Sequence, residues 1–107
     1  MRVILDECLP RKLAADLVGH IVITVPKAGL AGIVNGKLLG LLQGKFDAFL
    51  TVDKNLPAQQ KTKGLLLGII VLRASSNRLK DLKPLVPEIL NALAALEPGQ
   101  VVVVGKS

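Results

Sequence analysis

The sequence predicts a single α/β domain whose centre is a mostly parallel β-sheet of about five strands. Short apolar segments alternate along the chain with segments of helical periodicity, which is the order of elements in such folds. Several of the apolar segments are apolar throughout, as strands that are buried on both faces of a parallel sheet require. We therefore expect helices to pack on both faces of the sheet.

The strands are predicted from short apolar runs that are bounded by turn-forming residues. They are residues 2–5, 20–25, 46–52, 65–72 and 101–104. The connections that contain glycine, proline or polar residues are residues 26–34, 53–63 and 74–77. The second of these connections is predicted to be a loop or a short helix.

The first two helices are predicted from apolar stripes and from their end signals. Residues 9–17 place apolar side chains on one face, Pro10 fits the first turn because it needs no N–H there, and Gly19 ends the helix. Residues 36–43 form the second helix, with Asn35 as its N-cap. Its inward-facing side chains are predicted to be Leu38, Leu39, Leu41 and Leu42.

Residues 78–96 carry apolar side chains at alternating spacings of three and four, which is a helical stripe. Pro84 and Pro87 prevent one continuous ideal helix across this range, because proline removes a backbone donor and clashes with the preceding turn. We expect a short turn before Pro84, followed by a helix with the prolines in its first turns.

Composition limits the classes of protein and partner. The 107 residues are predicted to form one domain, 1–107, with an aliphatic core and a tendency to form a homodimer, since half of the residues are apolar and two are aromatic. The net charge of +6 favours a polyanionic partner such as nucleic acid. The sequence has no signal-peptide pattern and no apolar run long enough to span a membrane, so we expect a cytoplasmic protein. One cysteine excludes an intramolecular disulfide and a Cys-rich zinc site.

Chemically active side chains follow three of the predicted strands. They are Asp6, Glu7 and Cys8 after the first strand, Thr51, Asp53, Lys54 and Asn55 after the third, and Arg73 after the fourth, with Ser75, Ser76 and Asn77 close behind. In an open parallel sheet, ligands bind beyond the carboxyl ends of the strands, so these groups are expected to converge there. Carboxylates brought together from separate strands suit Mg²⁺ or Mn²⁺, and Lys54, Arg73 and Arg78 are expected to contact a nucleic-acid backbone.

The acidic residues also have structural interpretations. An acid just before a helix is commonly an N-cap or a partner of the helix dipole, so Glu7 is open between a helix cap and a support for the metal site. Asp53 in "VDKN" can form an Asx turn. For Asp6 we favour a functional role, because it stands at the tip of a strand, before the region of the cap.

A thiol site is the third interpretation of the stretch "LDEC". A nucleophilic cysteine needs a base, and His20 is the one histidine of the sequence. His20 begins a strand whereas Cys8 follows one, so we expect them at opposite edges of the sheet and interpret Cys8 as a small apolar filler. The terminal "GKS" does not have the P-loop spacing and lacks the helix that must follow it.

Three segments resemble, in order and spacing, the motifs of a family of short PIN-like proteins. They are "MRVILDECLP", "FDAFLTVDKNLP" and, from Ile70, "IVLRASSNRL". Typical members open with Leu-Asp-Glu-Asn-Leu-Pro and continue with an Asp, Thr, Asp series and an Arg after the fourth strand. The resemblance covers nearly the whole chain and implies a three-layer α/β/α sandwich. It also implies a Mg²⁺- or Mn²⁺-dependent endoribonuclease, often the toxin of a bacterial toxin–antitoxin pair.

The resemblance also implies roles for individual residues. Asp6 and Asp53 would be the catalytic carboxylates and metal ligands, and Thr51 and Asn55 supporting residues. In our hypothesis for this chain, Glu7 is a further acid that supports the metal. One departure concerns the start of the second helix, where relatives tend to carry acids and this chain has Asn35 and Lys37. That departure leaves a second function open, a catalytically impaired PIN-like module that binds RNA or a protein partner such as an antitoxin.

Overall fold

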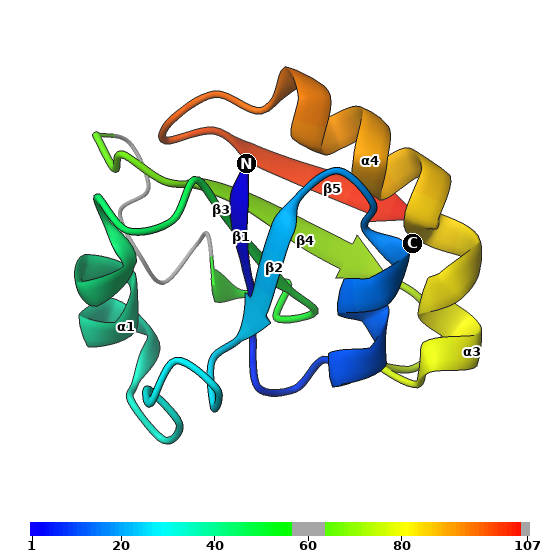
Figure 1. Ribbon diagram of the computed structural model, residues 1–107, viewed down its shortest axis with the longest axis horizontal. Helices are drawn as coiled ribbons and strands as arrows, with labels where there is room; N and C mark the ends of the chain where they lie inside the picture. Colours follow the sequence, from blue (N-terminus) through cyan, green and yellow to red (C-terminus); the bar gives the residue numbers. More distant parts are fainter. Residues whose placement is uncertain (57–63, 106–107) are drawn as a thin grey trace.

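The protein forms a five-stranded sheet in which every pair of neighbouring strands is parallel (Figure 1). The computed structural model describes residues 1–56 and 64–105. The strands are β1 (Arg2–Leu5), β2 (Ile21–Thr24), β3 (Ala48–Thr51), β4 (Gly68–Arg73) and β5 (Val101–Gly105), in the order β2-β1-β3-β4-β5. The predicted α/β class and the parallel sheet are therefore confirmed.

The helical elements lie on both faces of this sheet. They are the 3₁₀ helices η1 (Arg11–Asp16) and η2 (Lys83–Leu85) and the α-helices α1 (Asn35–Leu42), α3 (Leu79–Leu82) and α4 (Val86–Ala95). Figure 1 shows α1 on one side of the sheet and α3 and α4 on the other. The finer prediction of a PIN-like three-layer sandwich stays a prediction.

The two faces of the sheet have separate aliphatic cores, because successive side chains of a strand point to opposite faces. On one face Leu5 and Leu50 pack with Leu13 of η1 and with Ile89 and Leu93 of α4. On the other face, residues of α1 cover the sheet, and the core there comprises Ile4, Val25, Leu38, Leu39, Leu42, Phe49, Leu56, Leu67, Ile69 and Val71. Phe49 of the central strand β3 is fully buried in this second core.

The first predicted helix, residues 9–17, is wrong in type and length. The structure has a 3₁₀ helix, η1, with Pro10 at its N-cap rather than inside its first turn. The Leu13 and Leu17 N–H groups bond to carbonyls three residues earlier, those of Pro10 and Ala14, as in a 3₁₀ helix. The apolar stripe is nevertheless buried as predicted, since Leu9, Leu13 and Leu17 all belong to the core.

The second helix begins one residue earlier than predicted, and Asn35 is not its N-cap. The N-cap is Val34, whose carbonyl accepts the Leu38 N–H at 2.8 Å, and the Asn35 side chain makes no cap bond. Leu41, which was predicted to face inward, is 37% exposed because it lies on the outer side of this short helix. Leu38, Leu39 and Leu42 are buried as predicted.

The prediction for residues 78–96 is confirmed in outline. α3 precedes Pro84, η2 contains it, and α4 starts with Pro87 in its first turn. The apolar stripe predicted for residues 78–96 is buried at Leu82, Ile89 and Leu93.

The third and fourth strands are shorter at their N-terminal ends than predicted. The Phe46 N–H bonds to the Leu42 carbonyl at the exit of α1, so the ladder starts only when the Asp47 N–H reaches the Arg2 carbonyl at 2.8 Å. The prediction of a loop or short helix at 53–63 lies largely outside the described residues, since 57–63 are not described. Within the described part of the chain, no helix is long and apolar enough to cross a membrane.

Candidate functional site

The register of the sheet brings Asp6 and Thr51 to the same edge. Leu5 pairs with Leu50 in the parallel ladder of β1 and β3, and the Asp6 N–H extends this ladder by donating to the Leu50 carbonyl at 2.9 Å. Asp53 follows β3 two residues after Thr51. The predicted convergence of the first and third strand ends is therefore present.

Thr51 links the two acidic residues. Its hydroxyl donates to Asp6 Oδ2 at 2.7 Å and accepts the Asp53 backbone N–H at 3.1 Å. Among the residues that the structure describes, Thr51 is the one polar residue that is fully buried. A buried hydroxyl that both donates and accepts fixes the position of the Asp6 carboxylate relative to the Asp53 backbone. Movement of either group would break one of these hydrogen bonds and leave the buried hydroxyl with an unpaired donor or acceptor.

The second half of the Asp6 environment comes from its own loop. Asp6 Oδ1 accepts the Glu7 N–H at 2.9 Å, and Oδ2 lies 3.5 Å from the Cys8 thiol, which donates to it. Burial raises the pKa of the Cys8 thiol, the charge of Asp6 and its hydrogen bond with the thiol raise it further, and the Val52 backbone opposes these effects. Cys8 therefore stays a protonated hydrogen-bond donor to the carboxylate, in addition to packing as the predicted filler.

The Asp53 carboxylate is held in two ways. Oδ1 accepts the Asn55 N–H at 3.0 Å, which is the Asx turn that the sequence allowed. Oδ2 accepts a long hydrogen bond, 3.4 Å, from the side-chain amide of Asn35 at the start of α1. The Asx turn orients the carboxylate and does not compete with a functional role. The position where the resembled family tends to have an acid thus contributes an amide that contacts Asp53.

Glu7 faces away from this pair. Its carboxylate is exposed, and Oε1 accepts the Gly32 N–H at 3.4 Å from the connection between β2 and α1. The interpretation of Glu7 as a helix cap is wrong, because η1 has Pro10 at its N-cap and no acid in its first turn. Glu7 lines a pocket of about 790 Å³ whose lining also includes Arg11 and Lys27 and does not include Asp53.

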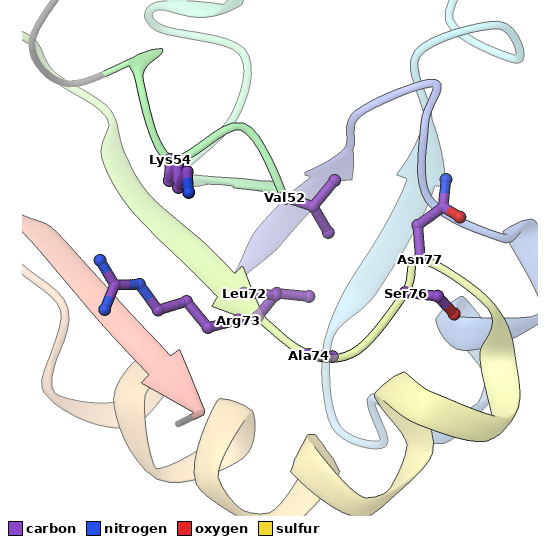
Figure 2. A pocket seen from close by; sticks show the side chains of 7 residues that line it. All are labelled: Val52, Lys54, Leu72, Arg73, Ala74, Ser76 and Asn77. Atoms are coloured by element: carbon purple, nitrogen blue, oxygen red, sulfur yellow. The ribbon is translucent and has the colours of Figure 1, made fainter. Parts of the chain in front are cut away.

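Two of the three predicted cations lie at a second pocket, of about 480 Å³, at the carboxyl ends of β3 and β4. Figure 2 shows Lys54 and Arg73 on one side of this pocket and Ser76 and Asn77 on the other. Arg78 is exposed and does not line it, although its backbone N–H donates to Ser76 Oγ at 3.0 Å. Lys54 and Arg73 therefore line a pocket whose described lining includes neither Asp6 nor Asp53.

The oxygen donors of Asp6 and Asp53 fit a divalent cation that shares its coordination with substrate and water. Within residues 1–56 and 64–105, no three His, Cys, Asp or Glu side chains form a cluster that could enclose a metal ion. Mg²⁺ is commonly bound through one or two carboxylates, with waters and phosphate oxygens completing its octahedron. Two hard carboxylates on a rigid sheet edge suit that mode, and they do not suit a closed structural site.

The sequence placed Asn77 at this edge, after the fourth strand, but did not predict its contact. The Asn77 amide donates to the Cys8 carbonyl at 2.7 Å and ties the end of β4 to the loop after β1. The contribution of Asn35 was not predicted, since its amide contacts Asp53 instead of capping its helix. Nothing local to Asn35 distinguished a helix cap from a contact with Asp53. His20 precedes Ile21, which pairs with Arg2, so it lies at the opposite edge from Cys8, as predicted.

Comparisons with protein-family models, with curated proteins and with solved structures returned no match for this chain. The assignment of a function therefore depends on the geometry of the sheet edge and on the resemblance of the three sequence segments.

Proposed function

We propose that this protein is a PIN-like, Mg²⁺- or Mn²⁺-dependent endoribonuclease that hydrolyses phosphodiester bonds at the carboxyl edge of its sheet. The observation that carries this proposal is the Thr51 hydroxyl, which connects Asp6 and Asp53 with distances of 2.7 and 3.1 Å. The resemblance of the surrounding segments suggests the biological setting, the toxin of a toxin–antitoxin pair with a protein antitoxin as partner.

In this mechanism Asp6 and Asp53 would hold the cation. Three of their four carboxylate oxygens accept one hydrogen bond each within the described contacts, which leaves lone pairs for a metal ion. When bound, the cation would lower the pKa of a water and neutralise charge on the scissile phosphate. Thr51 is a positioning residue, because it orients Asp6 and touches neither substrate nor metal. Asn55 acts through its backbone N–H, which fixes Asp53.

The cations of this edge supply the contacts to RNA. Lys54 and Arg73 line the pocket beside the acids, and Arg78 lies further along the same connection. Their charges, within a net charge of +6, attract the phosphate backbone and make binding sensitive to salt. Glu7 is exposed and engaged with Gly32, so its support of the site would be indirect.

A cleavage assay with purified protein, RNA and Mn²⁺ tests the proposal. Asp6→Asn and Asp53→Asn should each reduce the rate by at least about 100-fold, since each removes a metal-binding charge without changing side-chain size. Asp47→Asn is the matched control, because Asp47 is an exposed acid at the amino edge, paired with Arg2. Cleavage that persists unchanged in both site variants contradicts the catalytic role.

A specific observation favours the second function, a catalytically impaired module that binds RNA or a protein partner. The Asn35 amide donates to Asp53 Oδ2 from a position where an acid would have added a metal ligand, and Lys37 nearby is exposed. Under this alternative, RNA binding is salt-sensitive and proceeds without cleavage in Mn²⁺.

Sedimentation of the isolated protein tests the homodimer that its aliphatic composition suggests.

A further inference from the structure

The pocket at the ends of β3 and β4 has its own chemistry. Its seven lining residues are Val52, Lys54, Leu72, Arg73, Ala74, Ser76 and Asn77 (Figure 2). Its volume of about 480 Å³ lies within the range of small-molecule sites, roughly 300–1,000 Å³. We propose that this pocket binds one nucleotide of a single-stranded RNA, with its phosphate at the cations and its base against the aliphatic wall. This inference rests on the proposed function and names a substrate subsite beside it.

The pocket adjoins the acidic pair through the chain neighbours of Asp53 and through the loop that carries Asp6. Val52 stands between Thr51 and Asp53 in the chain, and its backbone also contacts the Cys8 thiol. Asn77 lies on the far side and donates to the Cys8 carbonyl at 2.7 Å. A nucleotide in the pocket would therefore be adjacent to a phosphodiester held at Asp6 and Asp53. We infer that the pocket takes the residue next to the scissile bond.

The charges of the lining match a phosphate. Among the lining residues that the structure describes, Lys54 and Arg73 are charged and none is acidic. Arg73 is half-buried at the end of β4, where its planar guanidinium can donate two hydrogen bonds to phosphate oxygens. Lys54 is exposed, so its contribution is more strongly screened by water and salt.

The remaining wall can accept a base but without aromatic stacking. Leu72 is 2% exposed and forms the floor with Val52 and Ala74. Asn77 uses its amide nitrogen on Cys8, which leaves its side-chain oxygen available as an acceptor for a base edge. Ser76 Oγ is already hydrogen-bonded to the Asp81 carboxylate. Because aliphatic contacts replace stacking, the affinity for one nucleotide should be weak, on the order of a millimolar.

Titration followed by amide chemical shifts, with EDTA and no added metal, tests this pocket with three probes. AMP should bind about tenfold more tightly than either inorganic phosphate or adenosine, because it alone engages both the cations and the aliphatic wall. The shifts should concentrate on the lining residues and on Asp53 and Cys8. Phosphate binding as tightly as AMP would overturn the proposal, because the wall would then contribute nothing.

Matched variants locate the binding. Arg73→Gln and Ala74→Glu should each weaken AMP binding about fivefold or more, the first by losing a donor fork and the second by adding a like charge. Arg11→Gln and Ala94→Glu are the controls, since both residues are exposed and neither lines the pocket. Equal binding by site and control variants refutes the pocket, and loss of binding in the site variants alone supports it.

The test of nucleotide binding in the pocket can be separated from the test of RNA cleavage. Asp6→Asn should retain AMP binding while losing cleavage, because AMP binding is measured without metal. Cleavage without AMP binding would refute the pocket alone, and AMP binding without cleavage would refute the nuclease alone. A short single-stranded RNA should compete with AMP and should bind more weakly to Ala74→Glu. If it does neither, the pocket takes free nucleotides and the inference about RNA is wrong.

Discussion

Replacing Thr51 by Val is the most informative single change, because it keeps the shape of the side chain and removes its hydroxyl. The hydroxyl makes two hydrogen bonds, one to the charged Asp6 carboxylate and one from the Asp53 N–H. A bond to a charged group contributes about 1.5–3 kcal/mol and a neutral one about 0.5–1.5 kcal/mol. The added methyl returns about 0.8 kcal/mol, and water reaches the half-exposed carboxylate. We therefore expect Thr51→Val to lower the free energy of unfolding by about 1–3 kcal/mol.

Urea denaturation measures this loss, and Mn²⁺ titration measures its effect on the site. Thr51→Val should reduce Mn²⁺ affinity by about tenfold, because a residue that orients a metal ligand typically changes affinity by this amount. Thr51→Ser is the control, since it keeps the hydroxyl and loses one methyl, at a cost of about 1 kcal/mol. Its Mn²⁺ affinity should stay within about twofold of the wild type.

Two results would refute this reasoning. Thr51→Val with wild-type stability would mean that the two hydrogen bonds contribute nothing net. Thr51→Ser losing as much Mn²⁺ affinity as Thr51→Val would mean that packing, rather than the hydroxyl, organises the edge.

Three further predictions concern the Cys8 thiol, Gly105, and Asn35, which stands where the resembled family tends to have an acid. Folding raises the pKa of the Cys8 thiol from 9.0, so the unfolded chain loses this proton at a lower pH than the folded protein does. The free energy of unfolding should therefore fall more steeply above about pH 9 in the wild type than in Cys8→Ser, as measured by urea denaturation. Gly105→Ala should lower the free energy of unfolding by about 2–4 kcal/mol in the same assay, because its φ is +101° and an added Cβ would meet the Arg73 carbonyl at the end of β4. Gly44→Ala is the control: its φ is +79° with open space around an added Cβ, so the loss should be about 1–2 kcal/mol. Asn35→Asp should destabilise the metal-free protein through repulsion of Asp53 and raise Mn²⁺ affinity in calorimetry by about tenfold. Unchanged stability would contradict the proximity of these side chains, and a lower Mn²⁺ affinity would contradict the addition of a metal ligand.

The strand ends could be predicted from the sequence because the apolar runs and the parallel topology leave little choice. Alternation of apolar strands and helical stripes places residues that follow β1 and β3 at one edge, which is how Asp6 and Asp53 were paired. The cations Lys54 and Arg73 were predicted by the same rule. The placement of these residues at the carboxyl edge depends on the topology of the sheet, which the pattern of apolar residues indicates.

The side-chain partners could not be predicted in the same way. Asn35 has two competing uses, to cap its own helix or to donate to a carboxylate from a distant strand, and local sequence does not rank them. The direction of Glu7 toward Gly32 depends on the path of a connection that contains glycines with positive φ. The 3₁₀ form of η1 could not be predicted either, since a stripe of leucines fits both kinds of helix over so short a range.

Calorimetric titration of Mn²⁺ into the metal-free protein tests the central claim most directly, that Asp6 and Asp53 form one divalent-cation site. The wild type and Asp47→Asn should bind one Mn²⁺ with a dissociation constant at or below about 1 mM, and Asp6→Asn and Asp53→Asn should each lose that binding. Equal binding by all four proteins, or no binding by the wild type at several times that concentration, would contradict the claim.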